Sequence, residues 1–373
     1  MTTERAISKA WVILLAALAA PPAMASDLTT SAGPVTIRPV VTGLAEPWGM
    51  DFLPDGRLVL TERDGRLLLV DGGKAEPVAG TPEVWAEGQG GLLDVLIPRD
   101  FATSREVWLT YVAPVPGGGA TAVGKGRLSE DGSTLEGFTR LWAGKGSGSG
   151  RHFGSRLAEG PDGAVYLTTG DRGTGPDGLA AQDPMRPEGK VIALNRDGSP
   201  AVTLPGHAPG VFNIGHRNAQ GLTTDGQGRL WLVEHGAKGG DEVNRIEAGR
   251  NYGWPVITYG VNYGLGTRIG EGQSKPGMVQ PLHVWVPSIA PSGMAFVSGS
   301  QFPQWQGDLL VGALRGQMLV RLVLDGEKVL REERLLQGRV GRIRDVRMGP
   351  DGFIYLLSDG PDGALMRLEP VKP

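Results

Sequence analysis

Residues 47–56 read Pro-Trp-Gly-Met-Asp-Phe-Leu-Pro-Asp-Gly, a short strand that leads into an Asp-Gly turn. Five later segments repeat this design: a polar or turn residue, a short strand, usually an Asp-Gly-type turn, and a second strand. They begin near Gln89, His152, Arg217, Pro291 and Arg342. The starts lie 42 to 74 residues apart, which suits propeller blades with loops of variable length. The sequence therefore predicts an all-β fold, a six-bladed β-propeller with four-stranded antiparallel blades.

The residue before each repeated strand has a predictable place in such a fold. The innermost strand of a propeller blade runs along the central channel, so the residue that precedes it lies at the channel mouth. The residues at these positions are chemically rich, namely Gln89, His152, Arg217 with Asn218, and Arg342 with Arg344. We expect these separated segments to form one pocket. A β-sandwich would not explain six similar units in series.

The N-terminus has the order of a secretory signal peptide. Arg5 and Lys9 precede an apolar run, residues 10–20, which is followed by the small-residue sequence Ala23-Met-Ala25. We therefore expect a signal peptide over residues 1–25, a single catalytic propeller domain over residues 26–373, and a periplasmic protein. No later run approaches the roughly 20 apolar residues of a membrane span, so no span is expected.

Composition excludes several kinds of chemistry. The chain has no cysteine, which rules out disulfides, thiolate nucleophiles and Cys-ligated metals. Its net charge of −3, with both signs interspersed, gives no reason to expect a nucleic-acid partner. With 60 Gly and 28 Pro but 40% hydrophobic residues, the chain is rich in turns and still able to bury a large core.

The pocket residues suggest a base and an anion-binding site. His152 is the best candidate for a general base, although a lone histidine is more often a hydrogen-bonded structural residue. Arg217, Arg315, Arg342 and Arg344 place four cations near one predicted channel. Guanidinium groups bind carboxylates bidentately, so together they indicate a planar ligand with several carboxylates. Taken singly, each could be a solvated or paired surface arginine.

Two acidic segments could bind a metal. The loop Glu234-His-Gly-Ala-Lys-Gly-Gly-Asp-Glu242, followed by Asn244, Asn251 and Tyr252, offers hard oxygen ligands that suit Ca²⁺. An ordinary hairpin loop is the alternative interpretation. A second and weaker candidate is the set Asp171, Asp177 and Asp183.

Seven motifs resemble one known family. They are Glu46-Pro-Trp-Gly-Met-Asp-Phe-Leu-Pro-Asp-Gly56, Gly88-Gln-Gly-Gly-Leu-Leu-Asp94, Arg151-His-Phe-Gly-Ser-Arg156, Gly215-His-Arg-Asn-Ala-Gln-Gly221, the 234–242 loop, Asn251-Tyr-Gly-Trp-Pro255 and Arg342-Ile-Arg-Asp-Val346. In this order they resemble the soluble quinoprotein glucose dehydrogenases, and more closely the shorter aldose sugar dehydrogenase branch. The match covers nearly the whole chain after the leader.

This resemblance implies a cofactor and roles for the residues. It implies a propeller that binds pyrroloquinoline quinone (PQQ) and Ca²⁺ and oxidises the C1 hydroxyl of aldoses to lactones. His152 falls on the catalytic base. The cofactor-binding positions fall on Gln89, His152, Arg217, Asn218, His235, Arg315, Arg342 and Arg344. The metal positions fall on the carbonyls of Gly236 and Ala237, and for a second, structural Ca²⁺ on Glu242 and the Tyr252 carbonyl.

Two positions depart from the family pattern. Ala237 stands where relatives often have Pro, a change that should be harmless because only the carbonyl coordinates the metal. Arg315 stands where relatives often have Lys, which keeps the charge but alters its reach and hydrogen-bonding geometry.

The expected partners are an aldose sugar and an external electron acceptor, since the sequence has no haem motif. The protein is expected to be a monomer or a homodimer. Two alternatives remain, a Ca²⁺-dependent lactonase-like hydrolase and a non-catalytic sugar-binding propeller. A lactonase would need several acidic or amide side chains around a central metal.

Overall fold

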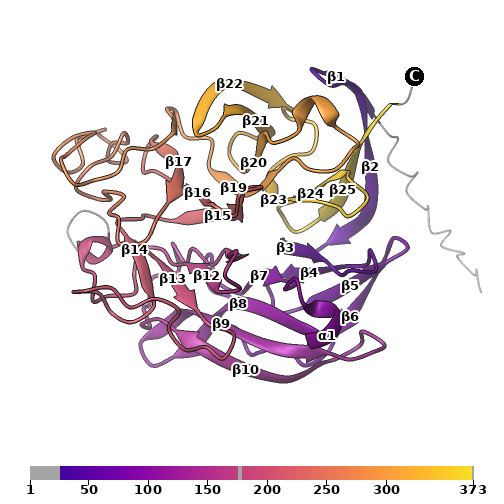
Figure 1. The fold of residues 1–373 in the computed structure, drawn as a ribbon, viewed down its shortest axis with the longest axis horizontal. Coiled ribbons are helices and arrows are strands. Elements are labelled where there is room, and N and C mark those ends of the chain that lie inside the picture. The colour runs from indigo at the N-terminus through magenta and orange to yellow at the C-terminus, as the bar shows by residue number, and fades with distance from the viewer. Residues whose placement is uncertain (1–25, 175–178, 372–373) are drawn as a thin grey trace, which may run out of the picture.

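Six small antiparallel sheets form a closed ring around a central channel (Figure 1). The structure is a computed structural model that describes residues 26–174 and 179–371. The predicted signal peptide and Asp177 lie outside these residues. The predicted six-bladed β-propeller is confirmed.

The innermost strand of each blade starts close to the position that the repeat predicts. These strands are β3 (Pro47–Phe52), β7 (Leu92–Leu96), β11 (Leu157–Glu159), β15 (Ala219–Thr224), β19 (Pro291–Phe296) and β23 (Ile343–Met348). Each contacts the innermost strand of the next blade, and β23 contacts β3, so the ring closes. The residues just before these strands therefore surround one end of the channel.

The remaining strands complete the blades in chain order. The first blade adds β4 (Leu58–Glu62), β5 (Leu67–Asp71) and β6 (Lys74–Val78), and the second adds β8 (Glu106–Val115), β9 (Gly118–Leu128) and β10 (Leu135–Ala143). The third adds β12 (Val165–Thr168), β13 (Lys190–Leu194) and β14 (Val211–Ile214), and the fourth adds β16 (Leu230–Glu234), β17 (Asp241–Ile246) and β18 (His283–Trp285). The fifth adds β20 (Leu309–Ala313), β21 (Met318–Asp325) and β22 (Lys328–Leu335). Short helical segments are α1 (Phe101–Ser104), η1 (Ala180–Gln182) and η2 (Pro303–Trp305).

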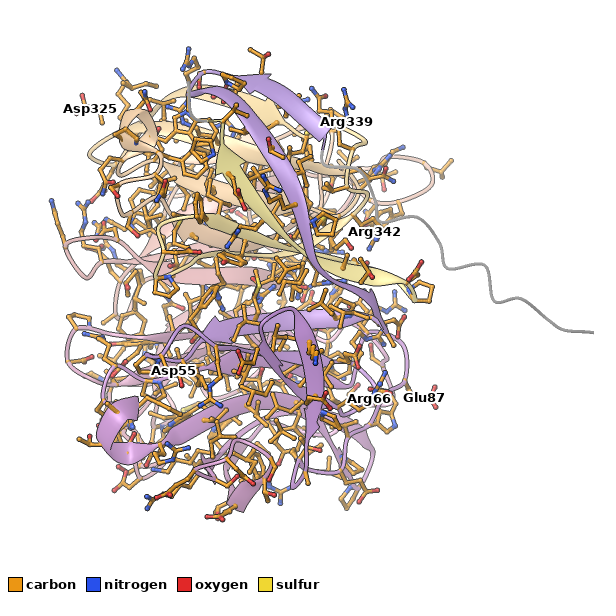
Figure 2. The ribbon with its side chains drawn as sticks, turned by 90° about the vertical axis from the view of Figure 1, so that its right-hand side faces the viewer. Asp55, Arg66, Glu87, Asp325, Arg339 and Arg342 are labelled. Carbon is orange, nitrogen blue, oxygen red and sulfur yellow. The ribbon has the colours of Figure 1, made fainter. Side chains whose placement is uncertain are left out.

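The sixth blade joins the two ends of the chain. After β23 it contains β24 (Ile354–Ser358) and β25 (Gly363–Pro370), and then the N-terminal strand β2 (Gly33–Leu44), which pairs antiparallel with β25. The short strand β1 (Ser26–Thr30) adds a fifth strand to this sheet, so the expected four strands hold for the other five blades. The side view shows β2 running along the yellow C-terminal strands (Figure 2). Backbone hydrogen bonds between the two ends thus close the ring.

Burial explains why the second strands are so apolar. All residues of β4, β16 and β20 are buried, because neighbouring blades cover both faces of each sheet. The outermost strands β6 and β22 are largely exposed and carry charged residues. Among the described residues, no helix has the length and apolarity needed to cross a bilayer.

The two faces of the ring carry different features. In the side view, Glu87 and Arg342 lie toward one face, whereas Asp55 of the first Asp-Gly turn lies toward the opposite face (Figure 2). Arg342 precedes β23, so the face it marks is the mouth of the channel.

Candidate active site

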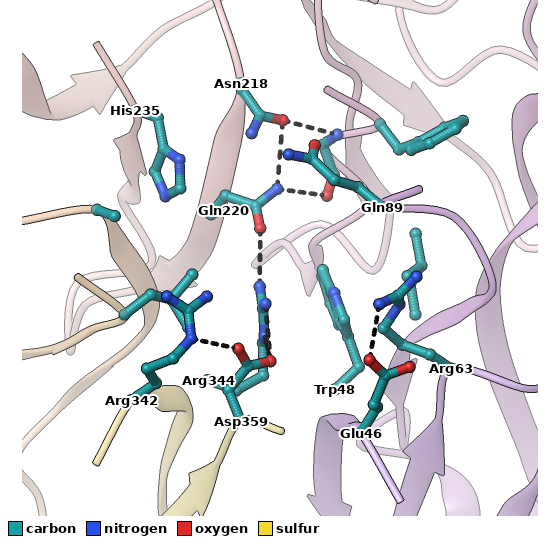
Figure 3. Close-up of a pocket in the computed structure, with 15 residues that line it drawn as sticks. Glu46, Trp48, Arg63, Gln89, Asn218, Gln220, His235, Arg342, Arg344 and Asp359 are labelled. Atoms are coloured by element: carbon teal, nitrogen blue, oxygen red, sulfur yellow. Dashed lines mark hydrogen bonds and ion pairs between the residues drawn. The ribbon is translucent and has the colours of Figure 1, made fainter. Parts of the chain in front are cut away.

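A cavity of about 260 Å³ opens at the mouth of the channel, and every blade contributes to its wall (Figure 3). One residue from the start of each blade illustrates this: Glu46, Gln89, Phe153, Asn218, Ala290 and Arg342. This volume is slightly below the roughly 300–1,000 Å³ typical of small-ligand pockets. The predicted gathering of mouth residues is therefore present for Gln89, Asn218, His235, Arg342 and Arg344, all of which line the cavity.

One wall of the cavity is cationic. Arg342 Nε and Arg344 Nη2 contact the two oxygens of Asp359, at 2.7 and 2.9 Å. Arg344 Nη1 also donates to Gln220 Oε1 at 3.3 Å (Figure 3). Burial alone would raise the pKa of Asp359, but the charges of Arg344 and Arg342 lower it. One carboxylate thus serves two guanidinium groups, which leaves positive charge for an anionic ligand.

On the other wall of the cavity, Arg63 holds the loop that carries Gln89 in place. Arg63 Nε donates to Gly90 O at 3.0 Å, and Arg63 Nη2 donates to Gly88 O. These two carbonyls flank Gln89, and Arg63 is also paired with Glu46 at 3.3 Å. These contacts fix the loop, and the Gln89 side chain lines the cavity.

His152 forms a buried pair with Asp171. His152 Nδ1 lies 2.6 Å from Asp171 Oδ1, and their side chains are 12% and 1% exposed. Asp171 Oδ1 also accepts from the Gly173 N–H, and its Oδ2 accepts from Trp254 Nε1 at 2.8 Å. Because an ionised carboxylate only accepts, His152 carries its proton on Nδ1 and leaves Nε2 free as a base.

Burial lowers the pKa of His152 below its usual value, and the hydrogen bond that its ring donates to Asp171 offsets this only in part. The imidazole is therefore neutral at neutral pH, which is the form that a general base needs.

The His152 backbone is tied to the cavity wall. Its N–H donates to Gln89 Oε1 at 2.8 Å, and the Gly154 N–H donates to Asn218 Oδ1 at 3.2 Å. The His152 ring is not part of the cavity wall itself, but the next two residues, Phe153 and Gly154, are. His152 lies beside the cavity, on the same segment that lines it.

Arg217 contacts His235, which lines the cavity. Arg217 Nη1 donates to His235 O at 3.3 Å, and its guanidinium lies 5.3 Å from the Trp254 ring. His235 Nε2 lies 2.7 Å from Pro291 O, so this nitrogen carries the proton. Burial lowers the pKa of His235 to about 4, which keeps the ring neutral with Nδ1 unprotonated.

A second, much smaller cavity of about 10 Å³ adjoins Arg217 and His235. It is lined by three of the predicted metal positions, Gly236, Glu242 and Tyr252, and has room for about one water-sized particle. Burial, together with the negative charge of Glu234, raises the pKa of Glu242 well above its usual value. A cation beside Glu242 would offset both the cost of burying the carboxylate and its repulsion by Glu234.

The neighbouring groups also bear on cation binding. Asn244 Nδ2 donates to Glu242 Oε2 at 3.3 Å, while Asn244 Oδ1 is buried without a hydrogen-bond partner. Ala237 O accepts from the Tyr263 hydroxyl at 2.9 Å and does not face the small cavity. Within residues 26–174 and 179–371 no cluster of three or more His, Asp or Glu could hold a metal. A cation here would depend mainly on main-chain oxygens and Glu242.

Two expectations find no support in the geometry. Arg315 is exposed in the turn after β20 and does not line the cavity, although its neighbour Leu314 does. Asp171, of the second candidate metal set Asp171, Asp177 and Asp183, has both oxygens engaged by His152, Gly173 and Trp254, and Asp177 lies outside the described residues.

Sequence reasoning missed two supporting carboxylates. Asp171 holds His152, and Glu234 accepts from the Arg217 N–H at 2.6 Å while contacting His216 Nδ1 at 2.7 Å. Glu234 and His216 are both buried. The sequence shows both the motif that contains Arg217 and the acidic loop that begins at Glu234. It does not show that these two segments are in contact.

Fold and site together define a propeller enzyme with an arginine-walled central cavity beside a histidine–aspartate pair. The sequence profile of the glucose/sorbosone dehydrogenase family matches residues 44–367. The aldose sugar dehydrogenase YliI of Escherichia coli is 39% identical over 360 residues, covering 93% of this chain and 96% of that protein. The chain belongs to the glucose/sorbosone dehydrogenase family.

Solved structures agree with this assignment. A crystal structure of a glucose dehydrogenase is 44% identical, covers 89% of this chain and 99% of its own, and superposes with a TM-score of 0.85. The PQQ-bound form of aldose sugar dehydrogenase from Streptomyces coelicolor is 30% identical, covers 94% and 99% of the two chains, and has a TM-score of 0.76. The chain is accordingly an oxidoreductase of this family.

Proposed function

We propose that this protein oxidises the C1 hydroxyl of aldose sugars to lactones, using PQQ and Ca²⁺, and passes the electrons to an external acceptor. The observation that carries this proposal is the His152–Asp171 pair beside a cavity walled by Arg342 and Arg344. The family membership and the PQQ-bound relative support the choice of cofactor.

The cavity residues suit a flat, polycarboxylated ligand. Arg342 and Arg344 would pair with its carboxylates, and the amides of Gln89 and Asn218 would donate to its remaining oxygens. Arg217 and His235 would complete the site from the side of the small cavity. When bound, PQQ supplies a hydride acceptor whose carbonyl Ca²⁺ polarises as a Lewis acid.

The proposed calcium positions are those that the family resemblance implies. The carbonyls of Gly236 and Ala237 would hold the cofactor-bound Ca²⁺. Glu242 and the Tyr252 carbonyl would hold the structural one, where the buried carboxylate of Glu242 lacks a cationic partner among the described residues.

The protein's own residues perform the proton transfer. His152 Nε2 takes the proton of the C1 hydroxyl, because Nδ1 is occupied by its bond to Asp171. Asp171 then stabilises the imidazolium that forms. The arginines of the cavity wall stabilise negative charge that develops on oxygen atoms in the cavity.

The alternatives fit less well. A lactonase would need free acidic ligands around a central metal, but the two carboxylates in the cavity wall, Glu46 and Asp359, are each paired with arginine. A purely sugar-binding propeller gives no role to an oriented histidine–aspartate pair. The leader sequence supports a periplasmic location, from which electrons must leave through a partner.

Reconstitution tests the proposal. The purified apoprotein is mixed with PQQ and CaCl₂, and dye reduction is followed with glucose and other aldoses, with lactone measured as product. We expect dye reduction that requires both additives. Protein that binds PQQ but oxidises no sugar would contradict the proposed activity, whereas hydrolysis of lactones without dye reduction would favour the lactonase.

A further inference from the structure

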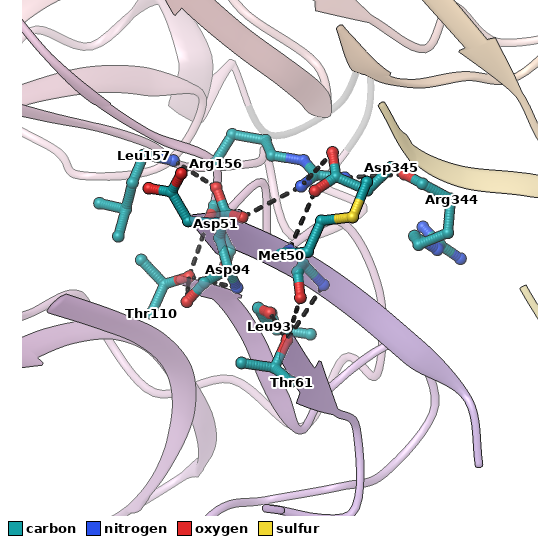
Figure 4. Close-up of polar contacts among 12 residues, drawn as sticks. Met50, Asp51, Thr61, Leu93, Asp94, Thr110, Arg156, Leu157, Arg344 and Asp345 are labelled. Atoms are coloured by element: carbon teal, nitrogen blue, oxygen red, sulfur yellow. Dashed lines mark hydrogen bonds and ion pairs between the residues drawn. The ribbon is translucent and has the colours of Figure 1, made fainter. Parts of the chain in front are cut away.

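One buried arginine outside the cavity wall connects three residues that line the cavity, which we call its floor: Trp48, Gln220 and Arg344. Arg156 immediately precedes β11, and its side chain is 1% exposed. It does not line the cavity and has no role in the chemistry proposed above. Figure 4 shows it reaching across the channel among the innermost strands.

Two buried aspartates neutralise Arg156. Its Nη1 lies 3.1 Å from Asp94 Oδ1 and 3.0 Å from Asp345 Oδ1, and both carboxylates are fully buried. Burial raises the pKa of Asp94, which Arg156 and Arg347 counteract. Charges of this kind are costly to bury unless they are paired and hydrogen-bonded.

The other contacts of Arg156 go to the cavity floor. Its Nη2 donates to Arg344 O at 2.8 Å, and its Nε donates to Gln220 O at 2.7 Å. The guanidinium lies 4.1 Å from the centre of the Trp48 ring. Arg344, Gln220 and Trp48 all line the cavity, and they belong to three different blades.

The geometry points to Arg156 as a positioning residue: its single planar guanidinium fixes Arg344, Gln220 and Trp48 relative to one another and so sets the shape of the PQQ-binding floor. This inference rests on the proposed function. A planar fork can donate along several fixed directions at once, whereas a lysine ammonium is a flexible point charge. The role therefore depends on the guanidinium and not on the charge alone.

Arg347 offers a matched control in the same charge cluster. It is 3.4 Å from Asp94 Oδ1 and 3.7 Å from Asp345 Oδ2, and it donates to Met50 O at 2.9 Å. Arg347 does not line the cavity, and it makes no hydrogen bond or ion pair with Trp48, Gln220 or Arg344 among the described residues. Arg347→Lys thus perturbs the same buried aspartates without releasing the cavity floor.

The test compares Arg156→Lys with Arg347→Lys in the full-length apoprotein. PQQ affinity is measured by titration with Ca²⁺ present, following cofactor absorbance, and the melting temperature is recorded for each variant. We expect Arg156→Lys to weaken PQQ binding about tenfold or more. Arg347→Lys should change the affinity by less than about twofold, even if its melting temperature falls as much as that of Arg156→Lys.

The outcomes are separable. Wild-type protein that binds no PQQ contradicts the proposed function. Wild-type protein that binds PQQ, with equal affinities for the two lysine variants, overturns the positioning role of Arg156. If Arg156→Lys does not fold, Arg156→Met combined with Asp94→Asn removes one buried charge of each sign, and the same tenfold loss is expected. Unchanged affinity in that double variant also overturns the inference.

Discussion

His152 and Asp171 are joined by a 2.6 Å contact between Nδ1 and Oδ1, and Trp254 secures the other oxygen of the carboxylate from the fourth blade. This relationship fixes both the orientation and the tautomer of the imidazole. His152 is thereby oriented as the proposed base requires. The same pattern orients histidines in hydrolytic triads, although the chemistry there is different.

Asp171→Asn should lower turnover by about 10²-fold or more, the usual scale for a compromised general base. The amide cannot stabilise the imidazolium by charge, and it can present an N–H to Nδ1 and so favour the wrong tautomer. Steady-state kinetics with glucose should show the loss in kcat, with PQQ affinity close to wild type. A variant that loses PQQ instead would assign Asp171 to cofactor binding.

The pH profile of kcat/KM should have an acidic limb below the usual histidine value of about 6.5. Burial lowers the pKa of His152, and the neutral ring is the active form, so activity falls only as the pH drops through this lowered value. In Asp171→Asn the contribution that raises the pKa is lost, and the limb should move to still lower pH. A limb above 6.5, or one that moves upward in the variant, would speak against His152 as the base.

Arg342→Gln should weaken PQQ binding about tenfold or more, because a carboxylate of the cofactor would lose its charge-assisted partner. Arg38→Gln is the control, since Arg38 is exposed on β2 and pairs with Glu369 far from the channel. The two affinities come from absorbance titrations at a fixed Ca²⁺ concentration. Equal losses in both variants would mean that the effect is one of net charge.

Calcium should stabilise the apoprotein more strongly at higher pH. The folded-state pKa of Glu242 is raised, so without metal this residue contributes stability at low pH that is lost as the pH rises through its folded pKa. A cation that binds the ionised carboxylate restores the loss. Melting temperatures with EDTA and with CaCl₂ at pH 5 and pH 8 measure this difference. In Glu242→Gln the pH dependence of the Ca²⁺ effect should vanish; its persistence would place the metal elsewhere.

The propeller could be predicted because its signals are local and repeated. Asp55-Gly56 and its counterparts mark the turns after the innermost strands, and the residue before each innermost strand falls at the channel mouth in every blade. Gln89, Asn218 and Arg342 could therefore be assigned to one cavity from sequence position alone.

Other features depend on contacts that no repeat encodes. Asp171 lies in a long loop 19 positions after His152, and sequence offered it only as a metal ligand. The pairing of β2 with β25 joins residues more than 300 positions apart, so no local sequence pattern indicates it. Arg315 remains a predicted cofactor contact, but its side chain is exposed beside the cavity and not in its wall.

The most direct measurement of the central claim is anaerobic single-turnover reduction of the reconstituted protein by glucose, followed through the cofactor absorbance. The account predicts that His152→Ala binds PQQ with near wild-type affinity and is reduced at least about 10²-fold more slowly. Reduction of this variant at the wild-type rate, or its failure to bind PQQ, would contradict the assignment of His152 as the base beside an arginine-walled site.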